Sequence, residues 1–438
     1  MSRQRIGVGL CGLGTVGSGV VTLLDRHARE LSSRCGLALE LVHIGARRDN
    51  PNCDTSRYKV SRDIFDVVSD PDVDILVELI GGTTTAFDLV QGALNAGKHV
   101  VTANKALMAA RGNELAALAE ENGVALRYEA AVAGGIPIIK TLRESLAANA
   151  IQSVAGIING TGNFILTEMA KAGRDFEDVL AEAQALGYAE ADPTFDIDGT
   201  DAAHKLVILA TLAFGIPLNS EGPFTEGINS VAPEDLRFAA ELGYVIKHLG
   251  IATRAGERVD LRVHPTLIPV DKQIATVDGV LNTVMIRSDG VGELVLVGPG
   301  AGALPTASAV CGDVADVAQH MARGIGDSLP VLGQPVSELQ ELATVPRGEV
   351  ESEWYLRMVV ADEPGAMADI TRLLGDHDIS IESLIQRPPE TGSTQVSVVI
   401  VTDRAPGAAI ERATSAIAAL DATDGSITML RIESFEAA

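Results

Sequence analysis

Short apolar runs alternate with segments of helical periodicity over the first third of the chain. Five of these runs are predicted to be strands: 6–11, 39–44, 75–79, 99–102 and 125–128. The segments between them, such as 17–31 and 85–95, repeat apolar residues at helical spacing. Buried strands that alternate with helices are typical of a parallel sheet. We therefore predict an α/β unit of the doubly wound, Rossmann type over residues 1–130.

The middle of the chain mixes strand-like runs with longer helical segments. Strands are predicted over 154–158, 261–268, 283–286 and 294–297, and helices over 138–146, 202–214 and 233–249. This mixture predicts a second, α+β domain over residues 131–325, which carries the catalytic face. A helix from Pro305 to Gly324 is expected to return and brace the first domain. Residues 326–352 contain three prolines and little periodicity, so they are predicted to be a linker.

The last part of the chain, residues 353–438, has a different order of elements. The pattern predicts a strand, a helix, two strands, a helix and a strand, over 355–361, 366–374, 379–386, 394–402, 406–420 and 426–433. This βαββαβ order is that of a ferredoxin-like fold.

Composition agrees with several domains and narrows the partners. A chain of 438 residues is too long for one hydrophobic core. The net charge of -25 argues against nucleic acid and anionic membranes as partners, because the field repels phosphates. Four cysteines without paired spacing indicate a reducing compartment, and no run is long enough to span a membrane. We expect a cytoplasmic protein.

A glycine motif, GLGTVG, follows the first predicted strand and opens a helix. Its residues are Gly12, Leu13, Gly14, Thr15, Val16 and Gly17. Gly12 permits a tight turn, Gly14 lets a pyrophosphate approach the backbone, and Gly17 lets the helix pack on the sheet. The helix N-terminus supplies amides for the phosphates. The motif in this context predicts a dinucleotide site.

Arg47 and Arg48 follow the second predicted strand and precede Asp49. A site that prefers NAD usually places its carboxylate first, whereas guanidinium groups can pair with the 2′-phosphate of NADP. We therefore predict a preference for NADP(H), with NAD(H) possible. The alternative is that both arginines are solvated loop charges and that Asp49 serves a ribose.

An acidic segment, GYAEADPTFDIDGTDAAHK, ends in a lysine directly before an apolar helix. Its carboxylates are Glu190, Asp192, Asp196, Asp198 and Asp201. Asp201 and Lys205 are four residues apart, so on a helix they share one face and can pair. A partly buried lysine beside carboxylates suits a general acid. The alternative is an ordinary ion pair at a capped helix. The other aspartates, Asp192, Asp196 and Asp198, are expected to order the loop.

The order of these motifs resembles that of the homoserine dehydrogenases. The similarity rests on GLGTVG, VTANKALMA (101–109), YEAAVAGGIPII (128–139), NGTGNFIL (159–166), the acidic segment and GAGALPTASAV (300–310). DEPGAMADI (362–370) looks like part of an ACT regulatory domain. The resemblance implies NAD(P)H-dependent reduction of L-aspartate 4-semialdehyde to L-homoserine, a step in threonine, methionine and isoleucine biosynthesis.

The resemblance also implies roles for single residues. Lys205 would give its proton to the developing alkoxide, and Lys105, after the fourth strand, would face both nicotinamide and substrate. Glu190 would bind the substrate ammonium with help from Asp201. Gly302 would lie beside the cofactor.

A cation site is implied by the same resemblance. The glycine-rich turn after the fifth strand leaves carbonyl groups free to bind a hard cation. The resemblance makes this ion Na⁺ or K⁺, near Glu129, Val132, Gly134 and Ile136. A plain turn before a helix is the alternative.

The ACT-like unit offers a turn, from Asp362 to Gly365, at a helix N-terminus. The resemblance implies L-threonine as a feedback inhibitor and a homodimer or homotetramer. A dimerising module that binds nothing is the alternative.

Two other functions compete with this assignment. An aldehyde dehydrogenase that forms a thioester would need Cys311, for which no paired histidine is evident. An amino-acid sensor without catalysis would have no need of Lys105, Glu190, Asp201 and Lys205 together.

Overall fold

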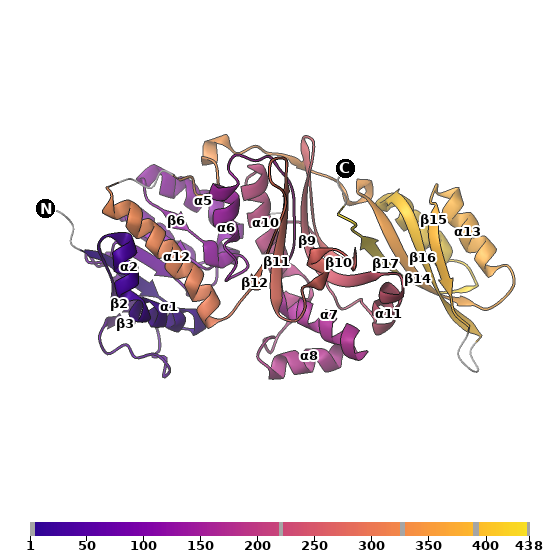
Figure 1. The fold of residues 1–438 in the computed structure, drawn as a ribbon, viewed down its shortest axis with the longest axis horizontal. Coiled ribbons are helices and arrows are strands. Elements are labelled where there is room, and N and C mark those ends of the chain that lie inside the picture. Colours follow the sequence, from indigo (N-terminus) through magenta and orange to yellow (C-terminus); the bar gives the residue numbers. More distant parts are fainter. Residues whose placement is uncertain (1–4, 219–221, 325–328, 389–393, 436–438) are drawn as a thin grey trace.

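The structure is a computed structural model that describes residues 5–218, 222–324, 329–388 and 394–435. Figure 1 shows an elongated molecule, with the N-terminal unit at one end and the C-terminal unit at the other. The middle of the chain lies between them. The predicted domain boundaries, at residues 130, 325 and 352, stay predictions.

A parallel sheet forms the N-terminal unit, as predicted for a Rossmann-type domain. The strand order is β3-β2-β1-β4-β5-β6. The strands are β1 (Arg5–Cys11), β2 (Ala38–Gly45), β3 (Lys59–Ser61), β4 (Ile75–Glu78), β5 (His99–Thr102) and β6 (Leu126–Arg127). The short edge strand β3 was not predicted, because three residues carry too little pattern. The order reverses at β1, where ligands of doubly wound sheets bind at the carboxyl ends of strands.

Helices connect these strands. They are α1 (Thr15–Arg26), α2 (Ala28–Cys35), α3 (Phe65–Ser69), α4 (Thr85–Asn95) and α5 (Lys105–Asn122). The segment 17–31, predicted from its helical spacing, is helical but divided between α1 and α2. The chain breaks at His27, whose φ of -114° is not helical and whose amide closes α1 by bonding Leu23 O.

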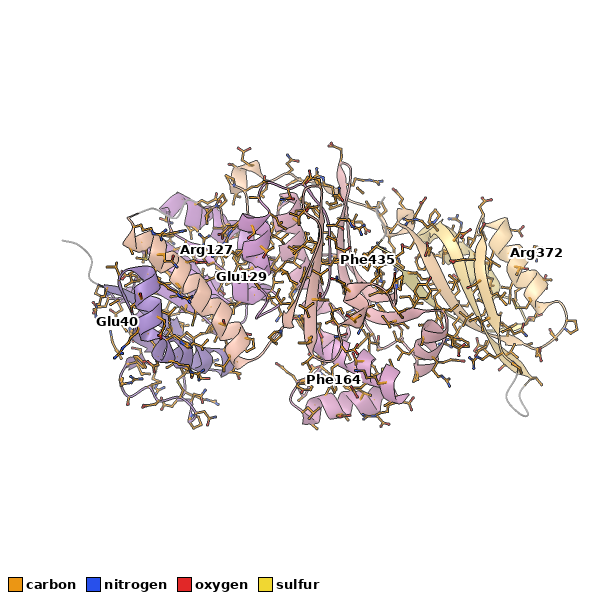
Figure 2. All side chains as sticks on the ribbon, in the orientation of Figure 1. Glu40, Arg127, Glu129, Phe164, Arg372 and Phe435 are labelled. Atoms are coloured by element: carbon orange, nitrogen blue, oxygen red, sulfur yellow. The ribbon has the colours of Figure 1, made fainter. Side chains whose placement is uncertain are left out.

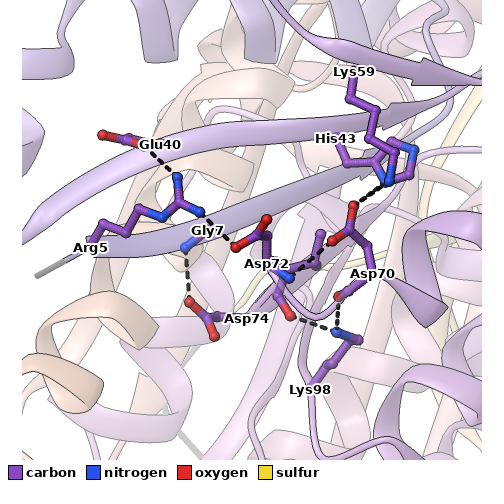
Figure 3. Close-up of polar contacts among 10 residues, drawn as sticks. Arg5, Gly7, Glu40, His43, Lys59, Asp70, Asp72, Asp74 and Lys98 are labelled. Carbon is purple, nitrogen blue, oxygen red and sulfur yellow. Dashed lines mark hydrogen bonds and ion pairs between the residues drawn. The ribbon is translucent and has the colours of Figure 1, made fainter. Parts of the chain in front are cut away.

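A polar network holds the sheet together beside the amino ends of β1, β4 and β5 (Figure 3). Asp70 accepts hydrogen bonds from Lys59 Nζ and pairs with His43 Nδ1, each at 2.8 Å. Hydrogen bonding from Lys59 outweighs burial and lowers the pKa of Asp70 to about 2. Lys98 Nζ donates to the carbonyl oxygens of Asp70 and Val73. These contacts stabilise the sheet near the amino ends of its strands. The carboxyl ends, where the glycine motif lies, are left for ligands.

The rest of the chain shares one large mixed sheet, in the order β12-β11-β7-β9-β10-β17-β14-β16-β15. Its strands are β7 (Ile151–Ile157), β9 (Tyr244–Ala255), β10 (Arg258–Pro269), β11 (Leu281–Ser288), β12 (Gly292–Pro299), β14 (Glu351–Ala361), β15 (Ile381–Gln386), β16 (Gln395–Pro406) and β17 (Thr423–Ile432). Short β8 (Phe224–Thr225) and β13 (Ala343–Thr344) also pair with β10.

The middle unit adds helices to this sheet. They are η1 (Glu129–Ala131), α6 (Ile138–Lys140), the π-helical η2 (Thr141–Ser145), α7 (Gly160–Ala172), α8 (Phe176–Ala185), α9 (Thr194–Ile197), α10 (Thr200–Phe214), α11 (Pro233–Glu241), η3 (Gln273–Thr276) and α12 (Ala303–Ala322). The predicted helix over 233–249 is wrong beyond Glu241. Gly243 has a φ of 83°, and the chain turns there into β9. A buried apolar strand and a buried helix look alike over so short a window.

The C-terminal unit has the predicted ferredoxin-like order, with α13 (Ala366–Asp376) and α14 (Gly407–Ala418) between its strands. Its strand β17 runs parallel to β10, with Thr266 opposite Arg431 and Leu267 opposite Ile432. The sheets of the middle and C-terminal units are therefore continuous, which the sequence did not predict.

Two later segments return to earlier units. Helix α12 packs against α1, as expected, with Ala307 and Val310 buried in the same cluster as Val20 (Figure 1). Residues 329–350, predicted as a linker and here called the strap, include η4 (Val336–Glu338), β13 and η5 (Arg347–Glu349). Tyr128 Oη donates to Val331 O at 2.8 Å. This hydrogen bond thus attaches the strap to the end of the N-terminal unit. None of the described helices is both long and apolar enough to cross a membrane.

Candidate active site

The carboxylate of Asp201 is the centre of a polar cluster at the start of α10. Asp201 is buried, with 4% of its surface exposed, and lies in the first turn, where the helix dipole favours negative charge. Gly199, with a φ of 89°, precedes the helix, and Asp198 accepts a hydrogen bond from Thr200 N at 2.8 Å. Local turn chemistry thus directs the carboxylate into the interior.

Two lysines compensate the buried charge of Asp201. Lys205 Nζ lies 2.7 Å from Oδ2, and Lys105 Nζ lies 3.1 Å from Oδ1. Burial by itself raises the pKa of Asp201, but the two ammonium groups and their hydrogen bonds outweigh it and lower the pKa to about 2. Asp201 is therefore ionised at neutral pH. The predicted ion pair between Asp201 and Lys205 is confirmed.

The ammonium group of Lys205 has capacity for a further contact. It donates to Asp201 Oδ2 and to the carbonyl oxygen of Ile158, which follows β7, each at 2.7 Å. An ammonium group has three N–H bonds, so one remains for another acceptor. The side chain is 12% exposed. Lys205 is thus held firmly while one donor stays available.

Lys105 comes from the N-terminal unit, as the first residue of α5 after β5. Asn104 caps that helix by accepting a hydrogen bond from Leu107 N at 3.0 Å, and it donates to Gly82 O at 2.7 Å. The lysine therefore projects from the carboxyl edge of the parallel sheet, the edge that carries the glycine motif. Its side chain is 34% exposed. The Asp201 carboxylate thereby connects the carboxyl ends of the strands in the N-terminal sheet to the middle unit.

Asn159 links a second carboxylate to this cluster. Its amide nitrogen donates to Asp201 Oδ2 at 2.8 Å and to Asp196 Oδ1 at 2.7 Å. Its amide oxygen caps α7 by accepting from Gly162 N at 2.7 Å. Burial raises the pKa of Asp196. The asparagine therefore orients both carboxylates from the start of α7.

The glycine motif has the geometry of a phosphate-binding turn. A Cβ atom at Gly12, where φ is 102°, would lie 2.4 Å from Leu79 O, and one at Gly17 would lie 2.1 Å from Gly12 O. At Gly14 a Cβ atom would meet nothing within 4 Å. Helix α1 begins at Thr15, directly after this open position. The turn thus packs tightly at two glycines and leaves room at the third for a pyrophosphate at the helix N-terminus.

Arginines gather at the loop after β2. Arg47 and Arg48 are exposed there. Asp49, the other candidate ribose ligand, pairs with Arg62 at 2.8 Å. Asn50 Nδ2 donates to Leu13 O at 3.1 Å and so ties this loop to the glycine motif. Several guanidinium groups therefore lie on the loops beside the glycine motif.

Glu129 anchors the turn for which a cation was predicted, and Figure 2 labels it beside α12. Its carboxylate oxygens accept hydrogen bonds from Ile139 N and Lys140 N, both at 2.8 Å. Its amide donates to buried Asp313, on α12, at 2.8 Å. Burial, with the Glu129 charge adding to it, raises the pKa of Asp313 to about 7. The Glu129 carboxylate thus caps α6 through the amides of Ile139 and Lys140.

The turn after Glu129 packs against the turn that precedes α12. A Cβ atom at Gly134 would lie 2.5 Å from Gly300 O, and Gly135 N donates to Pro299 O at 2.9 Å. Gly302, with a φ of 122°, precedes α12. Ala303 in turn lies against α1, because a Cβ atom at Gly19 would be 2.6 Å from Ala303 O. Gly302 thus lies beside the helix that the glycine motif opens.

Comparison with known proteins decides the family. Family models described as "Homoserine dehydrogenase, NAD binding domain", "Homoserine dehydrogenase" and "ACT domain" match residues 12–129, 137–315 and 354–419. A homoserine dehydrogenase of Pseudomonas aeruginosa is 50% identical over 430 residues, 98% of this chain and 99% of that protein. The chain belongs to the homoserine dehydrogenase family. Its activity is the NAD(P)-dependent reduction of L-aspartate 4-semialdehyde to L-homoserine.

Solved homoserine dehydrogenases share the fold. One from Thiobacillus denitrificans superposes with a TM-score of 0.93 at 48% identity, and 98% of each chain is covered. A hyperthermophilic archaeal homoserine dehydrogenase in complex with NADPH superposes with a TM-score of 0.60 at 29% identity, over 72% of this chain and 97% of that one. The resemblance drawn from the motifs is confirmed.

The carboxylate of Glu190 does not share the burial of Asp201. The residue is exposed, and its carbonyl group, not its carboxylate, accepts a hydrogen bond from Gln184 Nε2 at 3.1 Å. Asp192 accepts from Thr194 and orders the loop, as expected. Asp196, which we had grouped with the loop residues, joins the cluster instead.

All four cysteines are free thiols. Cys311 is buried, and burial raises its pKa to about 12. A thiol in such surroundings is a poor nucleophile. The structure therefore gives no support to the thioester alternative.

Three further residues of the site were not predicted from the sequence: Asn159, Arg62 and His204. Asn159 and Arg62 carry contacts described above. His204 packs edge-on against Phe195, with ring centroids 5.5 Å apart, and burial followed by the Lys105 charge lowers its pKa. Asn159 is the first residue of the motif NGTGNFIL, and this motif was the signal in the sequence that could have identified it. No local pattern marks Arg62, because its partner Asp49 lies in a different loop.

Proposed function

We propose that Lys205 is the general acid of the homoserine dehydrogenase reaction and that Asp201 and Lys105 position it. The arrangement of one buried carboxylate between two ammonium groups is the observation that carries this proposal. Bound NADPH supplies a hydride to the aldehyde carbon. The remaining N–H bond of Lys205 donates to the aldehyde oxygen and transfers its proton as the C–O π electrons move to that oxygen. The products are the alcohol, the oxidised nicotinamide cofactor and the neutral amine of Lys205, which solvent reprotonates.

The remaining polar residues serve the substrate. We propose that Lys105, at the cofactor edge, adds positive charge near the developing alkoxide. Glu190 binds the substrate ammonium with Asp201. The Glu190 side chain is exposed, so it is accessible to a ligand.

We infer that the cofactor is preferentially NADP(H), with NAD(H) possible. The exposed arginines Arg47 and Arg48 are suited to the 2′-phosphate, and Arg62 engages Asp49, which would otherwise serve the ribose. The NADPH complex of the archaeal relative supports the same choice. The open position at Gly14 takes the pyrophosphate, and Gly302 lies beside the cofactor.

We propose a monovalent cation, Na⁺ or K⁺, at the turn after η1. Its donors would be the Glu129 carboxylate and the carbonyl oxygens of Val132, Gly134 and Ile136. The donor set fits, because each carboxylate oxygen retains a lone pair beside its amide hydrogen bond. The ion would supply positive charge at the junction between the nucleotide-binding and middle units.

We propose L-threonine as a feedback inhibitor that acts through the ACT domain. The turn from Asp362 to Gly365 leads into α13, and Gly365 has a φ of 106°. Its amides suit an amino-acid carboxylate. The subunit number, two or four, stays a prediction from the family.

Replacing Lys205 tests the general acid. Lys205→Met is expected to lower kcat by about 10²- to 10⁴-fold, the usual contribution of a positioned acid. Lys205→Arg keeps a cation for Asp201 but is a poor proton donor, so it should fold normally and also lose kcat. Lys171→Met, which removes an exposed lysine paired with Asp278, is the control. Steady-state rates together with thermal melting separate chemistry from folding, and parental kcat in Lys205→Met would refute the proposal.

Cofactor preference is tested by kcat/KM with NADPH and NADH. NADPH is expected to be favoured by at least about tenfold, or ~1.4 kcal/mol. Arg48→Gln should raise the KM for NADPH and leave that for NADH unchanged, because only NADPH carries the 2′-phosphate. Arg34→Gln, an exposed change on α2, serves as control. A preference for NADH in the parent enzyme contradicts the inference.

The cation is tested by the choice of salt. Activity in NaCl or KCl should exceed that in tetramethylammonium chloride at equal ionic strength, because the large organic ion cannot enter a turn of carbonyl groups. Restoring Na⁺ or K⁺ should restore the rate. Equal rates in all three salts would show that the turn needs no ion.

Threonine inhibition is tested by titrating L-threonine, with L-serine as the matched control. The rate is expected to fall with L-threonine, and Gly365→Val should abolish the effect, because a β-branched residue strains a φ of 106°. Gly375→Ala, in the last turn of α13, is the control variant. Inhibition that persists in Gly365→Val places the effector elsewhere.

A further inference from the structure

A small cavity lies where the middle unit, the strap and the ACT domain meet. Its volume is about 210 Å³. Three arginines from these three parts of the chain form its wall: Arg262 on β10, Arg347 on the strap and Arg431 on β17. Asp260 is the one carboxylate in the wall. The lining is therefore cationic, in a chain whose overall charge is strongly negative.

Arg431 is a buried cation with incomplete compensation. It is 3% exposed and lies over the rings of Phe224 and Trp354, at 5.3 and 4.5 Å from their centroids. Among the described residues its Nε has no hydrogen-bond partner, and its ion pair, with Glu226, is as long as 3.8 Å. Burial, together with the nearby charge of Arg262, lowers its pKa to about 10. A buried charge normally has close partners, whereas the Nε of Arg431 has none among the described residues and its carboxylate partner is distant.

The other two arginines each pair with two carboxylates. Arg262 pairs with Asp260 at 3.0 Å and with Glu433 at 2.7 Å. Arg347 lies 4.2 Å from the centroid of the Phe224 ring. Its partners are Glu226 and Glu411, whose side chains are 38% and 46% exposed. Water screens such exposed carboxylates, so they offset the charges of Arg347 and of the buried Arg431 only in part.

We propose that this cavity binds a small anion with a carboxylate or phosphate group, held by the guanidinium groups of Arg262, Arg347 and Arg431. Planar guanidinium groups are the usual partners of both groups in proteins, because they donate paired N–H bonds. The cavity is below the volume of pockets for drug-sized ligands, which are roughly 300 Å³ or more. The ligand is therefore of the size of inorganic phosphate or a short dicarboxylate.

The cavity is connected to the active site by a short segment. Phe224, in its wall, belongs to β8, which pairs with β10 at Arg262. A few residues later, Ile228 N donates at 2.9 Å to the carbonyl oxygen of Ile197, the last residue of α9, which precedes α10. Gly227 fits closely there, because a Cβ atom would lie 2.3 Å from Ile197 O. An anion that holds β8 in place therefore stabilises α9, which carries Asp196, and the turn that leads to Asp201 at the start of α10; this second effect rests on the proposed active site.

Binding is tested on the full chain with NADP⁺ at saturation, so that the nucleotide site is filled. Inorganic phosphate and succinate are the probes, with chloride at equal ionic strength as the control, and calorimetry and thermal melting are the measurements. At least one probe is expected to bind saturably and to raise Tm where chloride does not. Binding of phosphate alone or of succinate alone supports the site and identifies the group it takes. Equal effects of all three salts overturn it.

Variants locate the binding. Arg347→Gln, at a half-exposed wall position that tolerates change, is expected to raise the Kd of the probe by about tenfold or more. Arg372→Gln, on the exposed face of α13, should bind as the parent does. Parental affinity in Arg347→Gln overturns the site.

Kinetics test the coupling separately. The probe is expected to change the KM for L-homoserine in the parent and not in Arg347→Gln. Calorimetric binding with unchanged KM leaves the anion site standing and overturns the coupling. Because calorimetry does not depend on turnover, an inactive enzyme would count against the proposed general acid without affecting this test of the site.

Discussion

The buried carboxylate of Asp201 is the constraint around which the active site is built. A lone carboxylate with 4% exposure would be strongly destabilising, so it requires cationic and hydrogen-bonding partners. These partners come from three places: Lys105 at the nucleotide-binding sheet, Lys205 on α10 and Asn159 at the start of α7. The compensation of one charge therefore fixes the nucleotide-binding edge relative to the catalytic helix. It also leaves an N–H bond of Lys205 free for chemistry.

Strand β10 is the corresponding constraint on the rest of the chain. It pairs with β9 in the middle unit, with β17 of the ACT domain, with β13 of the strap and with β8 beside the active-site loop. The ACT domain is thus an extension of the catalytic sheet and not a separate body on a flexible linker. Hydrogen-bonded strands therefore run without interruption from the ACT domain to β8. The arginine-lined cavity lies where these segments meet.

Most of the fold was predictable because its signals are local. Apolar periodicity located the principal strands of the N-terminal and ferredoxin-like units, and the glycine motif marked the dinucleotide turn. Prediction failed where competing signals were equally local: 233–249 is apolar enough for a helix, yet Gly243 ends α11 and β9 follows. The pairing of β10 with β17 joins residues far apart in the chain, and no window of sequence contains both.

The sequence by itself determined the chemistry of the site: a lysine one helical turn after an aspartate, a phosphate-binding turn, and arginines after the second strand. These depend on spacing within one element, so they survive without knowledge of the fold. Only the tertiary structure decided which charges meet. It brought Lys105 and Asn159 to Asp201, drew Asp196 into the cluster, left Glu190 exposed and placed three arginines around one cavity. Such contacts follow from how separate elements pack. A buried charge is stable only beside compensating partners, and the packing of the fold decides which residues those partners are.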